Sequence, residues 1–336
     1  MMRTLWQTLL LWCVASTTLG QGVDDGPTLD PNAGQAVVAP QEAVARTPAI
    51  AGPWWRICEM PDLGDLNGPE PRRQHIVDHG FIQACNGKWQ LWACMRGTAV
   101  SRLLYGWEGD SLEAGPWTPR GVVARAEAKY GEQIRVADGK RAETMQAPFF
   151  MQLDGIYHCF YNSAGIRLMT SENGIDYQRA AFKDTGTNLL YPDGGRDVMV
   201  LKIGDTFYSY STISTRDGRG YVNLKTSQDL RQWSRSKAVC EGGRGGVGPV
   251  TSESPFVVAL DGYYYLFRAS SMTFKTYVYR SKDPAYFGID DDRFLVATLP
   301  IKAPEIIHND GKWYISDLAD FQGVNLARLH WTIDGQ

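Results

Sequence analysis

The sequence lacks several features that would place it in other classes of protein. Its 336 residues contain no lysine- or arginine-rich run, and the net charge is −3, so nothing favours a nucleic-acid partner. The six cysteines include no Cys-x-x-Cys pair, which argues against a metal bound by cysteine. The glycine-rich run at 242–248 follows no strand-to-helix pattern, so we reject a phosphate-binding loop as well.

The apolar run at the N-terminus is too short to cross a membrane. Residues 1–20 begin with a basic residue, Arg3, continue with the apolar run from Leu5 to Val14, and end with small residues. This pattern is typical of a secretory signal peptide. We therefore expect a secreted or periplasmic protein with no membrane span.

Residues 21–52 have no apolar period and are rich in alanine, proline, glycine and aspartate, which predicts a disordered linker. The remaining residues 53–336 are enough for one folded domain with a large core, and we expect a monomer. Without the predicted signal peptide the chain has five cysteines, an odd number. One or two disulfide bonds fit an exported protein, but their pairing stays open.

The stretch from Thr251 to Arg268 shows the pattern that organises the chain. An apolar run leads to Asp261-Gly262, and an aromatic-rich alternating run follows. Asp-Gly accepts the positive φ angles of a type I′ turn, so the stretch predicts two antiparallel strands. The same design recurs in four further segments, at 81–89, 147–157, 196–208 and 303–314.

Repeats of roughly 40 to 50 residues built from short strands are typical of a β-propeller. A second strand pair with a Ser-x-Asp-like turn follows most hairpins, at 170–177, 226–233 and 280–284. We therefore predict an all-β fold, a five-bladed β-propeller whose four-stranded antiparallel blades surround a central channel.

Acidic residues stand where the first strand of several repeats begins, and these positions should meet at one mouth of the channel. Aligning the turns places Asp78 level with Glu253, and Asp197 one residue further along its strand. Gln146 and Lys302 occupy this place in the second and fifth repeats. Three carboxylates close together repel one another, so the pKa of at least one should rise.

Glycoside hydrolysis needs such a set of carboxyl groups. One is kept protonated to donate to the leaving oxygen, and another is ionised to act as base or nucleophile. A third can hold the sugar or tune the acid. The alternative is that each carboxylate only caps a loop or pairs with a cation, but three matched positions favour the site.

Two short motifs resemble those of the five-bladed propeller glycosidases, the clan that holds glycoside hydrolase families 43, 62, 32 and 68. Arg196-Asp197 before an apolar strand resembles the Arg-Asp-Pro motif of families 32 and 68. Glu253-Ser254-Pro255 resembles their Glu-Cys-Pro motif. The blade that starts at Asp197 also resembles a family 43 blade, and the resemblance covers nearly the whole mature chain.

By this resemblance, Asp78 is the general base or nucleophile and Glu253 is the general acid. Asp197 is the carboxylate that tunes the acid and stabilises the transition state. His79 and Val198 stand where the families have proline. The departure at His79 leaves Asp62 and Asp65 as alternatives to the first acid.

Four residues are predicted to bind substrate, and three of them have a structural alternative. His79 would contact sugar hydroxyls or serve the loop, and Arg196 would bind substrate or orient the adjacent aspartate. Trp107 or Trp55 would form a platform for a sugar ring, although core packing fits both indoles equally well. Gln146 lies at the entry of the second repeat.

His308 resembles in position the channel histidine that contacts a cation in some family 43 enzymes. A histidine of the core or one bonded to water is the stronger interpretation, so we expect no metal site and no required cofactor. A structural calcium ion in the channel is the alternative.

These observations predict an exported glycoside hydrolase acting on plant or algal polysaccharide, with an arabinofuranosidase, xylosidase or fructosidase range. A chain that ends after the fifth blade resembles family 43, which implies inversion, whereas family 32 implies retention. A carboxyl spacing of roughly 6.5 to 9.5 Å distinguishes inversion from the about 5 to 5.5 Å of retention. The alternatives are a non-catalytic carbohydrate-binding propeller and a glycoside phosphorylase, which needs a cluster of cations to hold phosphate opposite the acid.

Overall fold

The computed structural model describes residues 43–335, so the predicted signal peptide and most of the predicted linker lie outside the described residues. Within 43–335 the chain forms twenty-four strands and five short 3-10 turns. The turns are η1 (Gly64–Leu66), η2 (Pro71–Arg73), η3 (Ala128–Tyr130), η4 (Gly243–Gly245) and η5 (Ala319–Phe321). None of these described helices is long and apolar enough to cross a bilayer.

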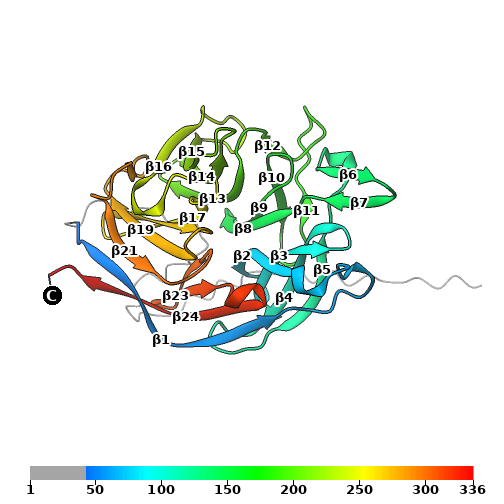
Figure 1. The fold of residues 1–336 in the computed structure, drawn as a ribbon, viewed down its shortest axis with the longest axis horizontal. Helices are drawn as coiled ribbons and strands as arrows, with labels where there is room; N and C mark the ends of the chain where they lie inside the picture. Colours follow the sequence, from blue (N-terminus) through cyan, green and yellow to red (C-terminus); the bar gives the residue numbers. More distant parts are fainter. Residues whose placement is uncertain (1–42, 336) are drawn as a thin grey trace, which may run out of the picture.

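The strands form five sheets around a common centre (Figure 1). The first sheet contains β2 (His75–Gln83), β3 (Trp89–Thr98), β4 (Ser101–Gly109), β5 (Thr118–Ala124), β6 (Ile134–Ala137) and β7 (Lys140–Glu143). The second contains β8 (Gln146–Leu153), β9 (Ile156–Asn162), β10 (Ile166–Ser171), β11 (Gln178–Arg179) and β12 (Leu189–Tyr191). Both begin with the predicted hairpin.

The third sheet contains β13 (Arg196–Ile203), β14 (Thr206–Ser214), β15 (Gly220–Ser227), β16 (Lys237–Glu241) and β20 (Gly288–Ile289). The fourth contains β17 (Glu253–Leu260), β18 (Tyr263–Ser270), β19 (Lys275–Ser281) and β21 (Leu295–Leu299). The fifth contains β22 (Ile306–Asn309), β23 (Lys312–Asp317), β24 (Gly323–Ile333) and β1 (Arg46–Glu59).

The all-β class is confirmed, but the strand count differs from four in three of the five sheets. Short added strands extend the outer edges of the first, second and third sheets. Two of the pairings, β4 with β7 and β16 with β20, are parallel rather than antiparallel. Such strands of two to four residues carry too few side chains to show an alternating pattern in the sequence.

Apolar side chains fill the space between neighbouring sheets all the way around. One core cluster joins the second, third and fourth sheets, and another joins the first and second. A third joins the fourth and fifth, and the last joins the fifth back to the first. The inner strands of all five sheets also line one narrow cavity of about 80 Å³ at the centre.

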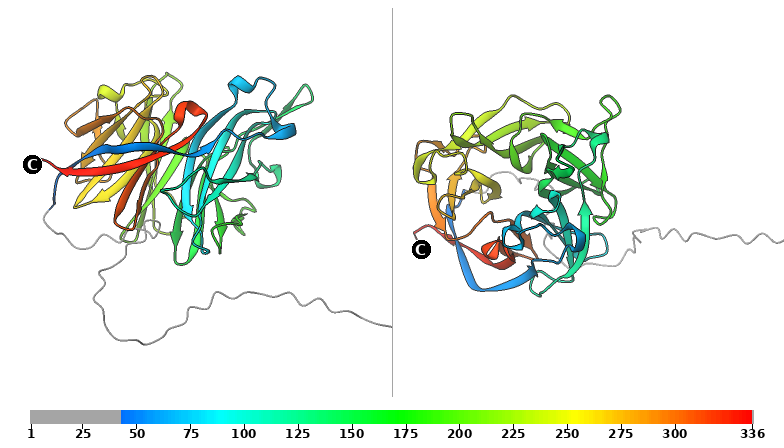
Figure 2. Two further views of the ribbon diagram at one scale, coloured as in Figure 1. Left: turned by 90° about the horizontal axis from the view of Figure 1, so that it is seen from below. Right: turned by 45° about the vertical axis from the view of Figure 1, so that its right-hand side comes forward.

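The fifth sheet is completed by the start of the folded chain. β1 pairs antiparallel with β24, from Arg46 opposite Ile333 to Glu59 opposite Gly323. Figure 2 shows these two strands, blue and red, side by side. The fold therefore starts inside the segment 21–52 that composition assigns to a linker. An edge strand forms backbone hydrogen bonds on one side only, so it tolerates proline. The prolines and alanines of this segment are why its composition does not predict a strand.

The first residues of β1 also connect the fifth sheet to the fourth. Arg46 donates from Nε to Asp261 at 2.5 Å and from its backbone N–H to the Tyr265 hydroxyl at 2.9 Å. Arg280 of β19 donates to the Arg46 carbonyl at 2.9 Å. Residues 46–52 thus hold the two ends of the folded chain against the preceding sheet.

Deleting these residues should therefore destabilise the fold. A chain that begins at residue 53 should melt roughly 5 to 10 °C below one that begins at residue 43, equivalent to about 2 to 4 kcal/mol at this size. Differential scanning calorimetry of the two chains measures the difference. Equal melting temperatures would show that the pairing of residues 46–52 with β24 contributes nothing to stability.

The cysteines of the described chain form no disulfide bond. Four of the five are buried in different sheets, and only one is exposed. They are Cys58, Cys85, Cys94, Cys159 and Cys240. The one or two disulfides that export would permit are therefore not formed in this part of the chain, where core packing joins the sheets instead.

Candidate active site

The innermost strand of every sheet begins with the same backbone irregularity. One residue in each takes a left-handed φ, and the partner strand shifts register beside four of the five. These residues are Asp78 (37°), Ala147 (53°), Asp197 (54°), Ser254 (45°) and Ala303 (45°). A bulge of this kind bends the strand and redirects the side chains beside it.

The bulges correct the alignment that the turns suggest. Asp78 and Asp197 are equivalent, and Glu253 stands one residue earlier, next to the bulged Ser254. The cause is the first hairpin, where Ala84 donates its N–H to the Lys88 carbonyl at 2.8 Å and leaves three residues in the loop. The corresponding loop of the fourth sheet has two residues, so counting from the turn displaces the first acid by one position.

The residues at and before these bulges meet at one mouth of the central channel, in a cavity of about 340 Å³. All three predicted acids line it, together with three other residues named from the sequence. The six are Asp78, Gln146, Arg196, Asp197, Glu253 and Lys302. Strands of four sheets and the loop before β22 of the fifth therefore supply this cavity.

Asp197 is the most deeply buried acid of the three, with 5 % of its surface exposed. Its Oδ2 accepts the backbone N–H of Ser254 at 3.2 Å and lies 3.2 Å from the Thr212 hydroxyl. The Arg196 guanidinium is 3.8 Å from the same oxygen. These contacts connect the third sheet to the start of the fourth and fix this carboxylate in one orientation.

Arg196 also forms an ion pair with Glu253. Its guanidinium is held by two further acceptors, the Ser214 hydroxyl at 2.8 Å and the Pro249 carbonyl at 3.1 Å. Arg196 therefore contacts both Asp197 and Glu253, as the prediction that it orients an acid requires. Its side chain also lines the cavity.

Burial and mutual repulsion raise the pKa of two of the acids. Burial raises the pKa of Glu253 to about 7, with Asp197 adding to the rise and Arg196 opposing it. Burial raises the pKa of Asp78 to about 8, with the charges of Asp197 and Glu253 adding to it and Arg102 opposing it. A carboxyl group in this cavity can therefore keep a proton at neutral pH.

The three acids are not equally spaced. Glu253 is near enough to Asp197 for a hydrogen bond between the two carboxyl groups to raise its pKa. Asp197 and Glu253 both raise the pKa of Asp78 through their charges. Glu253 and Asp197 therefore form a contact pair, and Asp78 lines the same cavity from the first sheet.

The alternatives to Asp78 lie elsewhere. Asp62 and Asp65 are in the loop before β2, and neither lines the cavity. Asp62 is bound to its own loop, since its Oδ1 accepts the Gly64 N–H at 3.0 Å. Asp78 is therefore the first-sheet acid of this site.

His79 does not line the cavity, contrary to the predicted sugar contact. It is 3 % exposed, and its Nε2 lies 2.8 Å from the Ser316 hydroxyl of the fifth sheet. Burial lowers the pKa of His79 to about 3, so the ring is neutral. Successive residues of a strand point to opposite sides, and the residue after Asp78 is directed inward between two sheets.

Trp107 is also not a sugar platform. It is 1 % exposed in the core between the first and fifth sheets, where its ring packs 4.8 Å from that of Tyr105. Trp55 packs against the same core, edge-on to Tyr314. In each case burying the large apolar surface of the indole in the core stabilises the fold more than exposing it in a polar cavity would.

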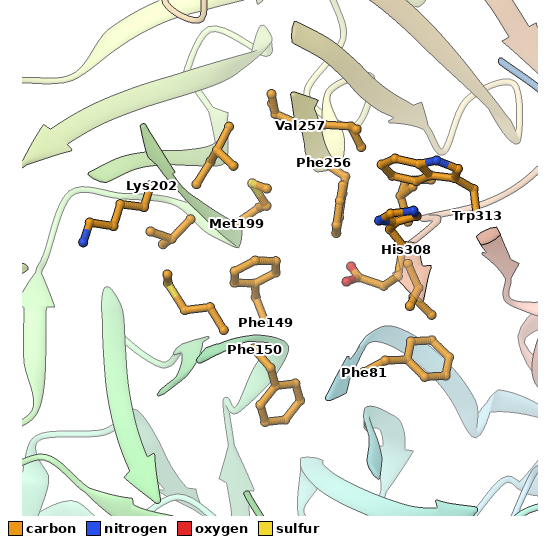
Figure 3. Close-up of a pocket in the computed structure, with 16 residues that line it drawn as sticks. Phe81, Phe149, Phe150, Met199, Lys202, Phe256, Val257, His308 and Trp313 are labelled. Carbon is orange, nitrogen blue, oxygen red and sulfur yellow. The ribbon is translucent and has the colours of Figure 1, made fainter. Parts of the chain in front are cut away.

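His308 lies in the apolar cavity at the centre and stacks on Trp313, with 4.3 Å between the ring centroids (Figure 3). Among residues 43–335 no three His, Cys, Asp or Glu side chains lie close enough together to hold a metal ion. Calcium takes six to eight oxygen ligands. Most side chains that line this cavity are apolar, and Glu305 is the carboxylate among them, so the structural calcium ion stays a prediction.

Sequence reasoning missed part of the cavity wall. His75, Arg96 and Arg102 of the first sheet line it, as do Phe274 and Phe321 on loops of the fourth and fifth sheets. The two arginines are the only charged residues in the mainly apolar run between residues 89 and 107. These two charges were the available signal for a polar wall.

No protein-family model and no curated protein matches the sequence. Solved structures do resemble its fold. A thermostable family 43 glycoside hydrolase has a TM-score of 0.55 at 14 % identity, covering 80 % of this chain and 95 % of its own. A family 43 β-xylosidase/α-arabinofuranosidase from a compost microbial metagenome, in complex with xylotriose, has a TM-score of 0.54 at 14 % identity, covering 84 % and 94 %.

A third similar structure is Zg3597, a family 117 glycoside hydrolase of the marine bacterium Zobellia galactanivorans. Its TM-score is 0.55 at 11 % identity, covering 86 % of this chain and 91 % of its own. Families 43 and 117 belong to the clan of five-bladed β-propeller enzymes. At these identities the likeness establishes the fold alone.

Proposed function

We propose that this protein is a glycoside hydrolase built on a closed five-bladed β-propeller. The observation that carries the proposal is the meeting of Asp78, Asp197 and Glu253, from three separate sheets, in one cavity where the pKa of two of them is raised. The cyclic packing of the five sheets supports the closed ring. The similar fold of family 43 and family 117 enzymes supports the class of reaction.

In this mechanism Glu253 is the general acid. Its proton passes to the glycosidic oxygen as the bond between that oxygen and the anomeric carbon breaks. Asp197 keeps the pKa of Glu253 high and, when ionised, stabilises the positive charge that develops on the sugar. Arg196 orients both carboxylates.

Asp78 is the base in the same mechanism. It takes a proton from the water molecule whose oxygen bonds to the anomeric carbon, so one proton leaves Glu253 and one reaches Asp78 in each turnover. The sugar would then be released with inverted configuration. If Asp78 instead attacks the sugar directly, the configuration is retained, and the anomer first formed distinguishes the two.

We further propose that the protein is exported and acts as a monomer on plant or algal polysaccharide without a cofactor. The signal-peptide pattern of residues 1–20 supports export. The xylosidase and arabinofuranosidase activities in the name of one similar structure support pentosides as the first substrates to test.

A non-catalytic binding protein is the alternative from a different class. An Asp78 directed away from the other two acids would favour it, as would a site lacking perturbed carboxyl groups. Asp78 lines the same cavity as Asp197 and Glu253, and the pKa of Asp78 is raised by their charges. This arrangement favours catalysis.

The test is hydrolysis of a panel of aryl glycosides and oligosaccharides, with the product anomer followed by NMR. The value of kcat/KM should be bell-shaped with its maximum between about pH 7 and pH 8. The base Asp78 is protonated below about pH 8 and the acid Glu253 loses its proton above about pH 7, so the productive form, with Asp78 ionised and Glu253 protonated, is a minor form that is most populated between these values. No hydrolysis of any member, or an optimum at pH 4 to 5, would contradict the proposal.

A further inference from the structure

Three basic side chains form a row across the first sheet at the wall of the cavity. His75 of β2 is directly opposite Arg96 of β3, and Arg96 is directly opposite Arg102 of β4. All three line the same cavity as the three acids. Neighbouring side chains on one face of a sheet lie about 4.5 to 5.5 Å apart at Cβ. Burial and the charge of Arg96 lower the pKa of His75, so the row places two guanidinium groups beside an imidazole.

This row has no counter-charge of its own. Arg96 and Arg102 have no hydrogen bond from their side chains and no carboxylate within 4 Å in the described chain. Arg96 is exposed and Arg102 is half-buried, and every other described arginine that is at least partly buried has an ion pair or a side-chain hydrogen bond. Like charges directly opposite in a sheet are destabilising, and here two arginines face each other without an acid to separate them.

The other charges of the cavity do not explain the row. Arg196 already pairs with Glu253 and lies near Asp197, and Lys302 pairs with Asp320 at 2.7 Å. Arg102 acts on Asp78 by its charge, at a separation beyond an ion pair. Arg96 is further along the row, and the Nδ1 atom of His75 is buried without a hydrogen-bond partner.

We propose that the row formed by His75, Arg96 and Arg102 binds an oxyanion carried by the sugar, either the carboxylate of a uronic acid or a sulfate ester. Guanidinium groups match both anions in shape and donate two parallel hydrogen bonds to them. The inference rests on the proposed function and assigns the substrate class of the same site.

The cavity also offers a surface for the sugar ring itself. Phe274 is 51 % exposed and stands edge-on to Phe321, with 6.2 Å between the ring centroids. Phe321 in turn lies 5.8 Å from the His75 ring. An apolar wall beside a basic row suits a ring that has one apolar face and one anionic substituent.

Binding of matched oligosaccharides tests the proposal independently of turnover. Isothermal titration calorimetry would use the Glu253→Gln variant with oligogalacturonides and their methyl esters, and with sulfated galactan oligosaccharides and their desulfated forms. One anionic form should bind roughly 10- to 100-fold more tightly than its neutral counterpart, as expected for charged hydrogen bonds. Which pair shows the difference identifies carboxylate or sulfate.

Substitutions locate the effect. Arg102→Gln and Arg96→Gln should each remove most of the preference, measured in each variant as the ratio of the affinities for the anionic and the neutral form. Arg235→Gln is the matched control, because Arg235 is exposed and lies outside the cavity, and it should keep the preference. Circular dichroism and melting temperatures confirm that each variant is folded.

The outcomes separate this inference from the proposed function. Equal binding of charged and neutral forms, or a preference that survives both arginine substitutions, overturns the inference even if neutral glycosides are hydrolysed. An arginine-dependent preference supports it even if no glycoside is cleaved. Cleavage that requires inorganic phosphate and yields a sugar 1-phosphate would assign the row to phosphate, overturning both the inference and hydrolysis.

Discussion

Replacing Glu253 with glutamine should lower kcat by about 10²- to 10⁴-fold, the usual contribution of a positioned general acid. Glutamine has nearly the same shape as glutamate, and its amide oxygen can still accept a hydrogen bond from Arg196. The Arg196 guanidinium therefore keeps a hydrogen-bond acceptor at this position. Glutamine has no proton to give to the leaving oxygen. Kinetics on aryl glycosides measure the loss.

The leaving group provides an internal control for this assignment. A dinitrophenyl group departs without protonation, so its glycoside should lose far less activity in the Glu253→Gln variant than an alkyl glycoside loses. Glu172→Gln is the matched substitution at an exposed glutamate outside the cavity, and it should behave as wild type. An equal loss for both leaving groups would mean that Glu253 positions substrate and does not donate the proton.

The hairpins were predictable because their signal is local. Asp154-Gly155, Asp261-Gly262 and Asp310-Gly311 all take positive φ at both turn residues, as a type I′ turn requires. Each turn also fixes the register of the two strands that it joins. Repeating this local signal around the chain was enough to give the all-β class and the five inner strands.

Pairings between distant segments were not predictable in the same way. β1 joins β24 across nearly the whole described chain through backbone hydrogen bonds, which leave little trace in side-chain composition. The short strands at the outer edges also pair through backbone hydrogen bonds, and they are too short to show an alternating pattern of apolar and polar residues. The sequence therefore placed the start of the domain at residue 53, although the first strand begins at Arg46.

The acids of the site were accessible to sequence reasoning, whereas the wall around them was not. Repeats place Asp197 and Glu253 at the same end of different sheets, whatever the details of the loops. Assigning His79 and Trp107 required knowing which side of a strand faces the cavity, and a shift of one residue reverses that side. The bulge at Asp78 makes such a shift, so His79 lies in the interior, and Trp107 of β4 is directed into the core between the first and fifth sheets.

Replacing Asp78 with asparagine should change activity and stability in opposite directions. Asparagine cannot take a proton from water, so kcat should fall by about 10²- to 10⁴-fold. A nucleophilic role for Asp78 would abolish activity as well, and the product anomer of the wild-type reaction distinguishes the two roles. Activity close to wild type would show that another group is the base.

The effect on stability follows from the raised pKa of Asp78, about 8 against an ordinary value of 3.8. Between these values the folded state keeps a proton that the unfolded state releases, so the stability of the wild-type protein falls as pH rises from about 4 through about 8. Asparagine has no proton to release. The melting temperature of the Asp78→Asn variant relative to wild type should therefore rise with pH and be highest above pH 8.

Melting curves from pH 5 to pH 9 measure this difference, with Asp205→Asn as the matched control at an exposed turn. The control should show no such rise. A gain of stability at alkaline pH together with a loss of turnover identifies a carboxylate held in place for chemistry at a cost to the fold. A lower melting temperature at every pH would instead mean that Asp78 supports the structure, and the proposed role as base would then lose its main support.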